Sequence, residues 1–267
     1  MKVAYCKNRK IIVTGYNGYI GSTYLKEKKI DWIEVDLDSI KTESTIIHLA
    51  ARAGLENDIN ILSNNLKCDL EVAEFAIKYG HRVVYVSTNN VYKKQINCTI
   101  GDEIRSRKEP YGLSKYLGEC LFSYLPDEKY VILRLADVFG FGQKHSNFFK
   151  AIEKTILGEG SFKFTDRGDK LRSYIYIDEM ISLLDHVINI NIFDGGIYNI
   201  CHRESCSLVD IYYAIFNETP EFNEGQLTSS YDYRTMKQSQ CFGYQYRYSL
   251  SDALNHYHSR CRKNRTL

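Results

Sequence analysis

Thr14-Gly15-Tyr16-Asn17-Gly18-Tyr19-Ile20-Gly21 follows a short β-branched run at 10–14 and precedes a helical pattern at 19–28. The order is therefore strand, glycine turn, helix. Glycines in such a turn let the backbone approach a pyrophosphate, which binds free N–H groups at the positive end of a helix. A glycine pattern by itself could be an ordinary turn, but this position favours a dinucleotide site. The residues predicted to contact the dinucleotide here are Gly15, Tyr16, Asn17, Gly18, Tyr19, Ile20 and Gly21.

Outward from this turn, apolar runs alternate with helical patterns along the first half of the chain. Apolar runs that end in polar or small residues are typical of buried parallel strands. We expect strands at 10–14, 32–36, 45–50, 82–87 and 130–135, with further helices at 60–79 and 111–122. The alternation predicts the α/β class, as a Rossmann-type doubly wound parallel sheet whose ligands bind at the carboxyl ends of the strands.

The pattern loosens after residue 138 into short strands and helices, which indicates a smaller, interleaved C-terminal part that binds the substrate. We expect a dinucleotide-binding Rossmann domain over 1–138, completed by about 174–200, and a substrate-binding part over 139–173 and 201–267. A chain of 267 residues can bury one main core with such an appendage.

Asp36 ends the apolar run at 32–36, and Leu37 follows it. A carboxylate at the end of the strand beside the glycine turn accepts hydrogen bonds from a ribose diol and repels a 2′-phosphate, so Asp36 favours NAD. Both residues are predicted to contact the cofactor. The alternative is that this strand is third in the sheet and that Asp36 lies near the adenine without reading the ribose. The stretch between the glycine turn and His48 is short enough for one strand to be missing.

Tyr111 and Lys115 lie one turn apart on the same face of the helix that begins after Pro110. A nearby ammonium stabilises a phenolate, so we expect Lys115 to lower the pKa of Tyr111 and make it an acid and base for a hydroxyl–carbonyl pair. In a chain with 22 tyrosines this spacing alone is weak. Its value comes from Ser87 and Thr88, which end the preceding strand and could bring a hydroxyl to the same reacting oxygen.

The composition argues against several classes of protein. A net charge of +2 gives no broad electrostatic reason to expect nucleic acid or an anionic membrane as a partner. No signal-peptide pattern and no run of about 18 apolar residues occurs. The eight cysteines have neither zinc-ligand nor disulfide-scaffold spacing. We therefore expect a cytoplasmic protein without a metal site.

Further stretches follow the glycine turn in a characteristic order. They are His48-Leu49-Ala50-Ala51, Val86-Ser87-Thr88-Asn89-Asn90-Val91-Tyr92, Tyr111-Gly112-Leu113-Ser114-Lys115, Arg134-Leu135-Ala136-Asp137-Val138-Phe139-Gly140 and Arg172-Ser173-Tyr174-Ile175-Tyr176-Ile177-Asp178. Together they resemble the NAD-dependent epimerase/dehydratase family of extended short-chain dehydrogenases/reductases, whose members mostly act on nucleotide sugars. The resemblance spans nearly the whole chain.

The resemblance implies roles for individual residues. Tyr111 would move a proton, Thr88 would hold the reacting oxygen, and Lys115 would tune Tyr111 and bind the nicotinamide ribose. Further cofactor contacts fall on Leu49, Ala50, Ala51 and Ser87. Substrate contacts fall on Thr88, Asn89, Asn90, Asp137, Asn147 and Arg172, of which the arginine would grip the nucleotide diphosphate.

Three positions depart from the family pattern or match it only loosely. Asp137 stands where an asparagine usually contacts the substrate, and a carboxylate near a diphosphate is repulsive unless it is paired or protonated. Ser173 replaces the acidic residue that usually follows the diphosphate arginine, although Arg172 itself suits a bidentate phosphate contact. Asn65 matches a helix asparagine of the family loosely, so we expect a solvated residue there.

The function implied is that of an NAD(P)-dependent nucleotide-sugar oxidoreductase that transfers hydride at a sugar carbon, expected at C4. It would be a 4-keto reductase or a 4-epimerase. Sugar 4,6-dehydratases of the family carry an Asp-Glu pair after the threonine, where this chain has Asn89 and Asn90. An amide does not shuttle a proton near neutral pH, so a 4,6-dehydratase is not expected.

NAD is the expected cofactor, with NADP as the alternative. The expected partner is a nucleotide-diphosphate sugar, and the resemblance implies a helix-mediated homodimer. A different class of function also fits a Rossmann fold, namely a redox sensor or partner-binding module that binds a dinucleotide without turnover. The retention of Thr88, Tyr111 and Lys115 together speaks against that alternative, because binding alone does not require them.

Overall fold

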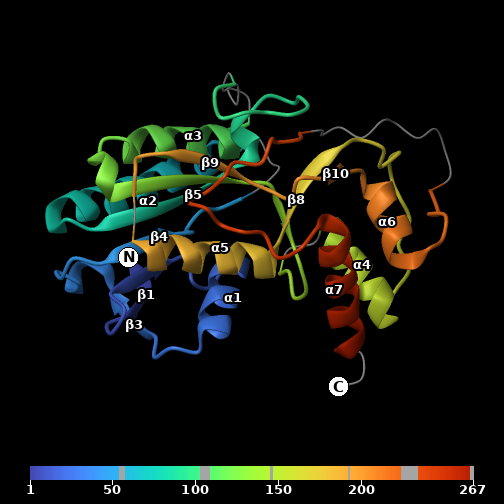
Figure 1. Ribbon diagram of the computed structural model, residues 1–267, viewed down its shortest axis with the longest axis horizontal. Coiled ribbons are helices and arrows are strands. Elements are labelled where there is room, and N and C mark those ends of the chain that lie inside the picture. Colours follow the sequence, from blue (N-terminus) through green and yellow to red (C-terminus); the bar gives the residue numbers. More distant parts are fainter. Residues whose placement is uncertain (54–57, 103–108, 145–146, 192, 224–233, 265–267) are drawn as a thin grey trace.

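The computed structural model describes residues 1–53, 58–102, 109–144, 147–191, 193–223 and 234–264 (Figure 1). In chain order, the elements are β1 (Lys2–Cys6), β2 (Ile11–Thr14), α1 (Tyr19–Lys28), β3 (Ile33–Asp36), η1 (Leu37–Ser39), β4 (Thr45–His48), α2 (Ile59–Tyr79), β5 (Arg82–Thr88), η2 (Asn89–Val91), α3 (Pro110–Phe122), η3 (Asp127–Lys129), β6 (Tyr130–Leu135), β7 (Asp137–Phe139), α4 (Phe148–Leu157), β8 (Arg172–Tyr176), α5 (Ile177–Ile190), β9 (Ile197–Ile200), β10 (Ser205–Cys206), α6 (Leu208–Phe216) and α7 (Leu250–Lys263). The short η elements are 3₁₀ helices.

The main sheet has seven strands in the order β3-β1-β2-β4-β5-β6-β9. From β2 to β9, each strand runs parallel to the next, and these strands are the buried apolar runs of the sequence. Helices α1 and α5 cover one face of the sheet, and α2 and α3 cover the other (Figure 1). The predicted Rossmann-type, doubly wound α/β fold is confirmed.

The strand on the other side of β2 is β1, which runs antiparallel to both β2 and β3. The run that ends at Asp36 is therefore the edge strand, separated from β2 by β1. The interpretation of this run as the strand beside the glycine turn is wrong, and the alternative, that it is third in the sheet, holds. The physical reason is local pairing: residues 7–10 connect β1 to β2 as a hairpin, which fills the place next to β2.

Side chains along each strand alternate between the two faces, as strand geometry requires. In β2, Ile11 and Val13 pack in the larger core cluster, whereas Ile12 packs in the smaller cluster with Val72 of α2 and Phe122 of α3. At the carboxyl end, this second face becomes polar. There Thr14, His48 and Tyr85 lie side by side on β2, β4 and β5, and they are called the polar row below.

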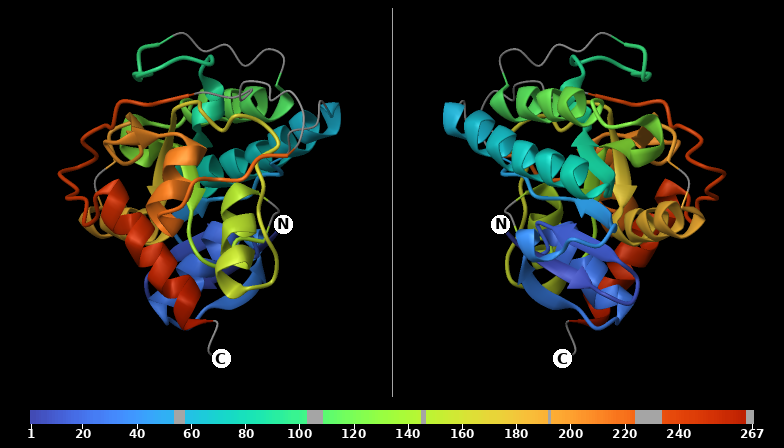
Figure 2. Two further views of the ribbon diagram at one scale, coloured as in Figure 1. Left: turned by 90° about the vertical axis from the view of Figure 1, so that its right-hand side faces the viewer. Right: turned by 90° about the vertical axis from the view of Figure 1, so that its left-hand side faces the viewer.

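A second sheet, of order β10-β8-β7, lies beyond the carboxyl end of β6 with α4, α6 and α7 (Figures 1 and 2). The chain crosses from one sheet to the other more than once: β7 and β8 belong to the second sheet, and β9 then returns to the main sheet, where it pairs with β6. The domain boundaries set out above stay a prediction. None of the helices in the described ranges is both long and apolar enough to cross a lipid bilayer.

Candidate active site

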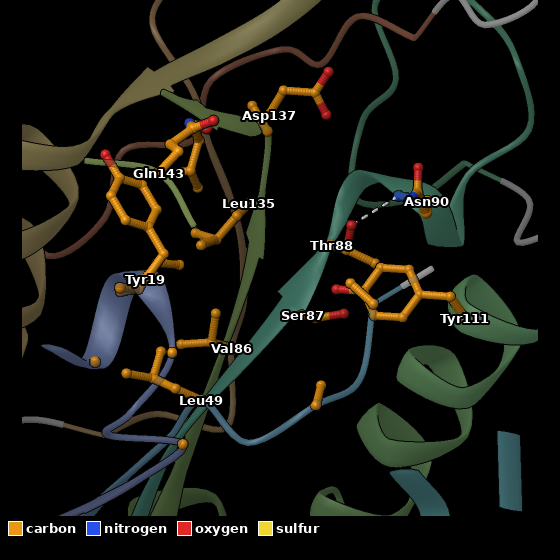
Figure 3. Close-up of a pocket in the computed structure, with 18 of the residues that line it drawn as sticks. Tyr19, Leu49, Val86, Ser87, Thr88, Asn90, Tyr111, Leu135, Asp137 and Gln143 are labelled. Atoms are coloured by element: carbon orange, nitrogen blue, oxygen red, sulfur yellow. Dashed lines mark hydrogen bonds between the residues drawn. The ribbon is translucent and has the colours of Figure 1, made fainter. Parts of the chain in front are cut away.

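A pocket of about 380 Å³ lies at the carboxyl ends of the parallel strands. Tyr19 of the glycine-turn segment lies on one side of the pocket and Thr88 and Tyr111 lie on the other, with Asp137 between them (Figure 3). The predicted residues that line it are Gly15, Gly18, Tyr19, Ile20, Gly21, Leu49, Ala51, Ser87, Thr88, Asn90, Tyr111, Asp137 and Asn147. The predicted residues that lie outside this lining are Tyr16, Asn17, Asp36, Leu37, Ala50, Asn89, Lys115 and Arg172.

The glycine turn needs glycine for two separate reasons. Gly15 has a φ of +63°, and a Cβ there would lie 2.7 Å from the backbone nitrogen of Ala50. A Cβ on Gly21 would lie 2.5 Å from the carbonyl oxygen of Gly15. Gly18 is the N-cap of α1 and has no side chain to satisfy the first N–H groups. The turn therefore presents bare backbone and the positive end of a helix to the pocket.

Tyr111 lies in the first turn of α3, and its ring points toward the end of β5, where Ser87 and Thr88 lie (Figure 3). Burial raises the pKa of Tyr111 to about 12, and the negative charges of Asp69 and Asp137 act in the same direction. The hydrogen bond with Thr88 lowers this pKa in part. The prediction that Lys115 lowers the pKa of Tyr111 below its ordinary value is wrong for this structure.

The reason is the direction in which Lys115 points. Its side chain is buried, and its Nζ lies 3.9 Å from the centre of the Tyr85 ring. Burial lowers the pKa of Lys115, and the charge of Asp69 is the largest effect that raises it. The ammonium is therefore held near Asp69 of α2 and Tyr85 of β5. Although Lys115 is only four residues after Tyr111, its charge is not among the effects that set the pKa of the Tyr111 phenol.

Ser87 and Thr88 differ in what their hydroxyls contact. The Ser87 hydroxyl donates to Glu119 Oε1 at 2.5 Å, and Glu119 forms a buried ion pair with Arg134 at 2.6 Å. The Thr88 hydroxyl accepts from the backbone N–H of Asn90 at 3.2 Å, which caps the short helix after β5. Thr88 is thus the hydroxyl at the end of β5 that lies with Tyr111.

Of the residues predicted to contact the substrate, Asp137 and Arg172 pair with each other, whereas Asn147 and Asn90 have other partners. Asp137 forms an ion pair with Arg172, Nε to Oδ2, at 3.4 Å, which supplies the pairing that a carboxylate near a diphosphate requires. Asn147 caps α4 by accepting from the Lys150 N–H at 2.9 Å. Asn90 accepts from Arg234 Nη1 at 2.7 Å. Sequence reasoning missed Arg234, which lies far along the chain in a stretch without a regular pattern.

The residues predicted to meet the adenosine ribose lie apart from the pocket. The Asp36 side chain is 61% exposed and pairs with Lys2 Nζ at 3.0 Å. Leu37 is fully buried in the smaller core cluster, so its side chain serves packing. Tyr16 donates a hydrogen bond to Glu34 on the same edge. The topology of β1 explains these positions, since it moves β3 one strand farther from β2.

Asn65 is not the solvated residue that was expected. Its side chain is buried, accepts from the Arg52 N–H at 2.8 Å and donates to Ser114 Oγ at 2.9 Å. It thereby joins α3 to the segment after β4, directly behind the site. The loose match to the family's helix asparagine was the signal that could have found it.

A segment after β7 also contacts the glycine turn. Lys144 lines the pocket and donates to the carbonyl oxygen of Asn17, while the Tyr19 hydroxyl donates to the Phe141 carbonyl at 3.4 Å. Gln143 lines the same side of the pocket (Figure 3). No sequence pattern marked this loop, because loops lack the periodicity that identifies helices and strands.

Comparisons with known proteins find similarity in both sequence and fold. The model of the NAD dependent epimerase/dehydratase family matches residues 37–201. A dTDP-D-glucose 4,6-dehydratase of Dictyostelium discoideum is 25% identical over 244 residues, covering 81% of this chain and 54% of that protein. The chain spans about half the length of the curated relatives it matches.

Two solved structures share the fold. The structure of MoeE5 in complex with UDP-glucuronic acid and NAD has a TM-score of 0.79 at 22% identity, covering 97% of this chain and 100% of that chain. The UDP-N-acetylglucosamine 4-epimerase from Bacillus cereus has a TM-score of 0.77 at 16% identity, covering 94% of this chain and 99% of that chain. Similarity at these identities shows the fold alone.

Proposed function

Because the chain belongs to the NAD-dependent epimerase/dehydratase family, we propose that it is an enzyme that uses NAD to transfer hydride at a sugar carbon of a nucleotide sugar, with C4 favoured. The observation that carries this proposal is the single pocket that joins the glycine turn to Thr88 and Tyr111. A relative named for dTDP-D-glucose supports a nucleoside-diphosphate sugar as the substrate class.

The described residues fit a dinucleotide. Gly15 and Gly21 leave a cradle that a Cβ would fill, and Gly18 presents uncapped N–H groups of α1, as a pyrophosphate requires. Leu49, Ala51 and Val86 supply small or apolar walls beside it. NADP stays the alternative cofactor, because the argument for NAD from Asp36 depended on a strand position that β3 does not have.

Bound NAD would supply the hydride acceptor and donor. Tyr111 would exchange the proton of the reacting sugar oxygen, and Thr88 would hydrogen-bond that oxygen. The family resemblance implies that Lys115 would hold the nicotinamide ribose, although its ammonium lies against Tyr85 and outside the pocket lining. Since burial raises the pKa of Tyr111 to about 12, its phenol is neutral at neutral pH and suited to donate a proton to a keto sugar. Removal of a proton by Tyr111 would need added positive charge nearby.

We also propose that the enzyme does not remove water from the sugar. Elimination requires an acid and a base besides the tyrosine, and Asn89 and Asn90 provide neither. Asn90 is moreover held by Arg234. Among the described residues that line the pocket, the one carboxylate is Asp137, which pairs with Arg172. A 4-epimerase or a 4-keto reductase is therefore favoured, and Arg172 is proposed to meet the diphosphate.

A dinucleotide-binding sensor without turnover remains the second candidate. Such a sensor would need the glycine turn. It would need neither the buried Lys115 nor the hydrogen bond between Tyr111 and Thr88. Assembly as a homodimer also stays a proposal, supported by the exposed Ile59, Leu70 and Ile77 on α2.

The test begins with the purified protein, in which mass spectrometry identifies any bound dinucleotide or nucleotide sugar. The protein is then incubated with UDP- and dTDP-hexoses and with a 4-keto nucleotide sugar plus NADH, and the products are followed by NMR. An epimer or a reduced sugar is the expected product. Formation of a 4-keto-6-deoxy sugar would contradict the exclusion of elimination, and tight dinucleotide binding without any turnover would favour the sensor.

A further inference from the structure

The polar row forms a buried polar cluster between the sheet and helices α2 and α3. Thr14, His48 and Tyr85 occupy adjacent positions on three parallel strands, and all three are fully buried. Asp69 of α2 is 0% exposed and lies against them. A carboxylate at this depth requires hydrogen bonds and an opposite charge, because an unpaired buried charge is strongly unfavourable.

The hydrogen bonds of the polar row converge on Asp69. His48 Nε2 lies 2.8 Å from Asp69 Oδ1, and the Tyr85 hydroxyl donates to Asp69 Oδ2 at 2.8 Å. His48 Nδ1 lies 2.6 Å from Thr14 Oγ1. Burial lowers the pKa of His48, so its ring is neutral at neutral pH. Nε2–H then donates to the carboxylate, and Nδ1 accepts a hydrogen bond from the Thr14 hydroxyl.

The row reaches the glycine turn at its other end. Thr14 Oγ1 accepts from the N–H groups of Leu49 and Ala50, each at 3.1 Å. The same Ala50 backbone closes on Gly15, where it leaves no room for a Cβ. Asp69 is therefore connected through His48 and Thr14 to the backbone that supports the dinucleotide turn.

A neutral histidine and a tyrosine cannot balance the charge of Asp69, and the cation whose charge acts most strongly on Asp69 is Lys115. Burial acts to raise the pKa of Asp69, but the charge of Lys115 is the largest effect that opposes it, followed by the hydrogen bond from His48, and the net pKa is lowered. Tyr85 contacts both partners, since it donates to Asp69 and lies under the Lys115 ammonium at 3.9 Å.

The other groups around Lys115 do not take this role. Cys68 lies on α2, Tyr111 and Glu119 on α3, Tyr85 on β5 and His48 on β4. Glu119 is the second carboxylate that acts on Lys115, but it is bound to Arg134 by three hydrogen bonds of 2.6–3.2 Å. Asp69 is thus the carboxylate left to balance Lys115.

Helix α3 is shaped around this pairing. Gly118 lies one turn after Lys115, and a Cβ there would come within 1.9 Å of the Tyr85 hydroxyl and 2.3 Å of Asp69 Oδ2. The glycine lets α3 approach the bond between Tyr85 and Asp69. The interface therefore accommodates the carboxylate with a specific backbone position.

We propose that Asp69 is a positioning residue that acts as the counter-ion of Lys115, keeping its ammonium charged and in place against Tyr85, and that couples it through His48 and Thr14 to the glycine turn. The part of this inference that concerns the nicotinamide ribose rests on the proposed function. The charge pairing itself can be tested without substrate or cofactor.

The test is a double-mutant cycle with Asp69→Asn, Lys115→Met and the double variant, measured by thermal unfolding at neutral pH without ligand. Each single change should lower the Tm, because each leaves one buried charge without its partner. The double variant should lose at least about 4 °C less than the sum of the two single losses. The matched control combines Lys115→Met with Glu74→Gln, which changes an exposed carboxylate on α2, the helix of Asp69. In this control the two losses of Tm should be additive.

A second measurement covers the case in which Asp69→Asn does not fold. In Lys115→Met, the unbalanced Asp69 should have a raised folded-state pKa, so stability lost at about pH 8 should be regained as the pH falls toward about 5. The Tm deficit relative to the wild type should therefore shrink on acidification. Additive losses in the cycle, or a deficit that is the same at both pH values, would overturn the counter-ion assignment.

Dinucleotide binding then tests the link to the site. If the wild type binds NAD, Asp69→Asn should weaken that binding by about tenfold or more, whereas Glu74→Gln should not. Unchanged NAD affinity in a folded Asp69→Asn protein would overturn the coupling to the glycine turn. A wild type that binds no dinucleotide would count against the proposed function, while the cycle would still decide the counter-ion role.

Discussion

At the scale of single residues, Tyr111 is the side chain on which the proposed chemistry depends most directly. Tyr111→Phe should reduce turnover by about 10²- to 10⁴-fold, because it removes the proton carrier from the pocket. NAD binding and the Tm should change little, since the ring is half-buried and loses one hydrogen bond, with Thr88. Steady-state rates and thermal unfolding measure these effects. Tyr124→Phe, at a position 84% exposed, is the matched control.

Retention of full turnover by Tyr111→Phe would remove the acid–base assignment. A loss of turnover accompanied by a clear fall in the Tm would instead indicate that the phenol serves the packing of α3. The two outcomes differ in the melting temperature, which is why both quantities are measured on the same preparations.

The residues that could be predicted from the sequence are those marked by local spacing. The glycine turn, Thr88 and Tyr111 each sit at a strand end or a helix start, and the structure brings them to one pocket. Arg234 and Asp69 could not be found in this way, because their roles depend on residues far away in the chain. Arg234 bonds Asn90, 144 positions away, and the charge of Asp69 acts on Lys115, 46 positions away. The pKa of Tyr111 was mispredicted, since spacing gives the nearness of Lys115 but not its direction.

At the scale of elements, the placement of β1 decides what the adenosine end of the pocket contains. In an ordinary doubly wound sheet, the strand beside the glycine strand ends at the cofactor. Here its place is taken by β1, which runs the other way and begins there, so Lys2 lies at this edge beside Asp36. The apolar runs of the sequence predicted β2, β3, β4, β5 and β6 but not β1. The order of the strands in the sheet could not be predicted, because a hydrophobic pattern does not say which strands pair.

This arrangement predicts that Asp36 does not select the cofactor. Asp36→Ala should leave the ratio of NAD to NADP affinity within about twofold, because the carboxylate is exposed and already paired with Lys2. Equilibrium binding of both dinucleotides to the wild type and the variant measures the ratio. A shift of tenfold or more toward NADP would restore the ribose-reading role of Asp36.

At the scale of the whole molecule, the main sheet and its covering helices could be predicted from the sequence. For the later half, the sequence indicated only short strands and helices and gave neither their bounds nor their pairing. The main sheet depends on strong apolar runs with helices between them, which are local signals. The second sheet has strands of two to five residues, too short to give a periodic pattern. Its position depends on contacts across the chain, as when β10 pairs with β8.

The whole molecule should also be unstable at high pH. Burial raises the pKa of Tyr85, Tyr174, Tyr176 and Tyr257 above the ordinary value of 10.0, and it raises the pKa of the Cys201 thiol from 9.0 to about 12. Below these ordinary values, both folded and unfolded states keep the protons. Above them, only the unfolded state loses protons, so each group lowers the free energy of unfolding by about 1.4 kcal/mol per pH unit until its folded pKa is reached.

Urea unfolding between about pH 8 and about pH 11 measures this effect. The free energy of unfolding should be nearly constant at first, begin to fall near the ordinary pKa of a thiol and fall steeply above that of a phenol. Tyr257→Phe should make the alkaline decline shallower. Equal stability at both ends of the range would contradict the burial of these groups.

The hairpin of β1 and β2 also sets the order in which one side of the sheet can assemble. Among the described strands, β3 pairs with β1 alone. The hairpin joins residues close in sequence, whereas β3 must first be carried past β2 by α1 before it meets Lys2–Tyr5. Because closing a short loop is faster than closing a long one, the hairpin forms first and becomes the template on which β3 docks. When the protein unfolds, β3 is correspondingly the strand on this side that can leave while the rest of the sheet stays paired.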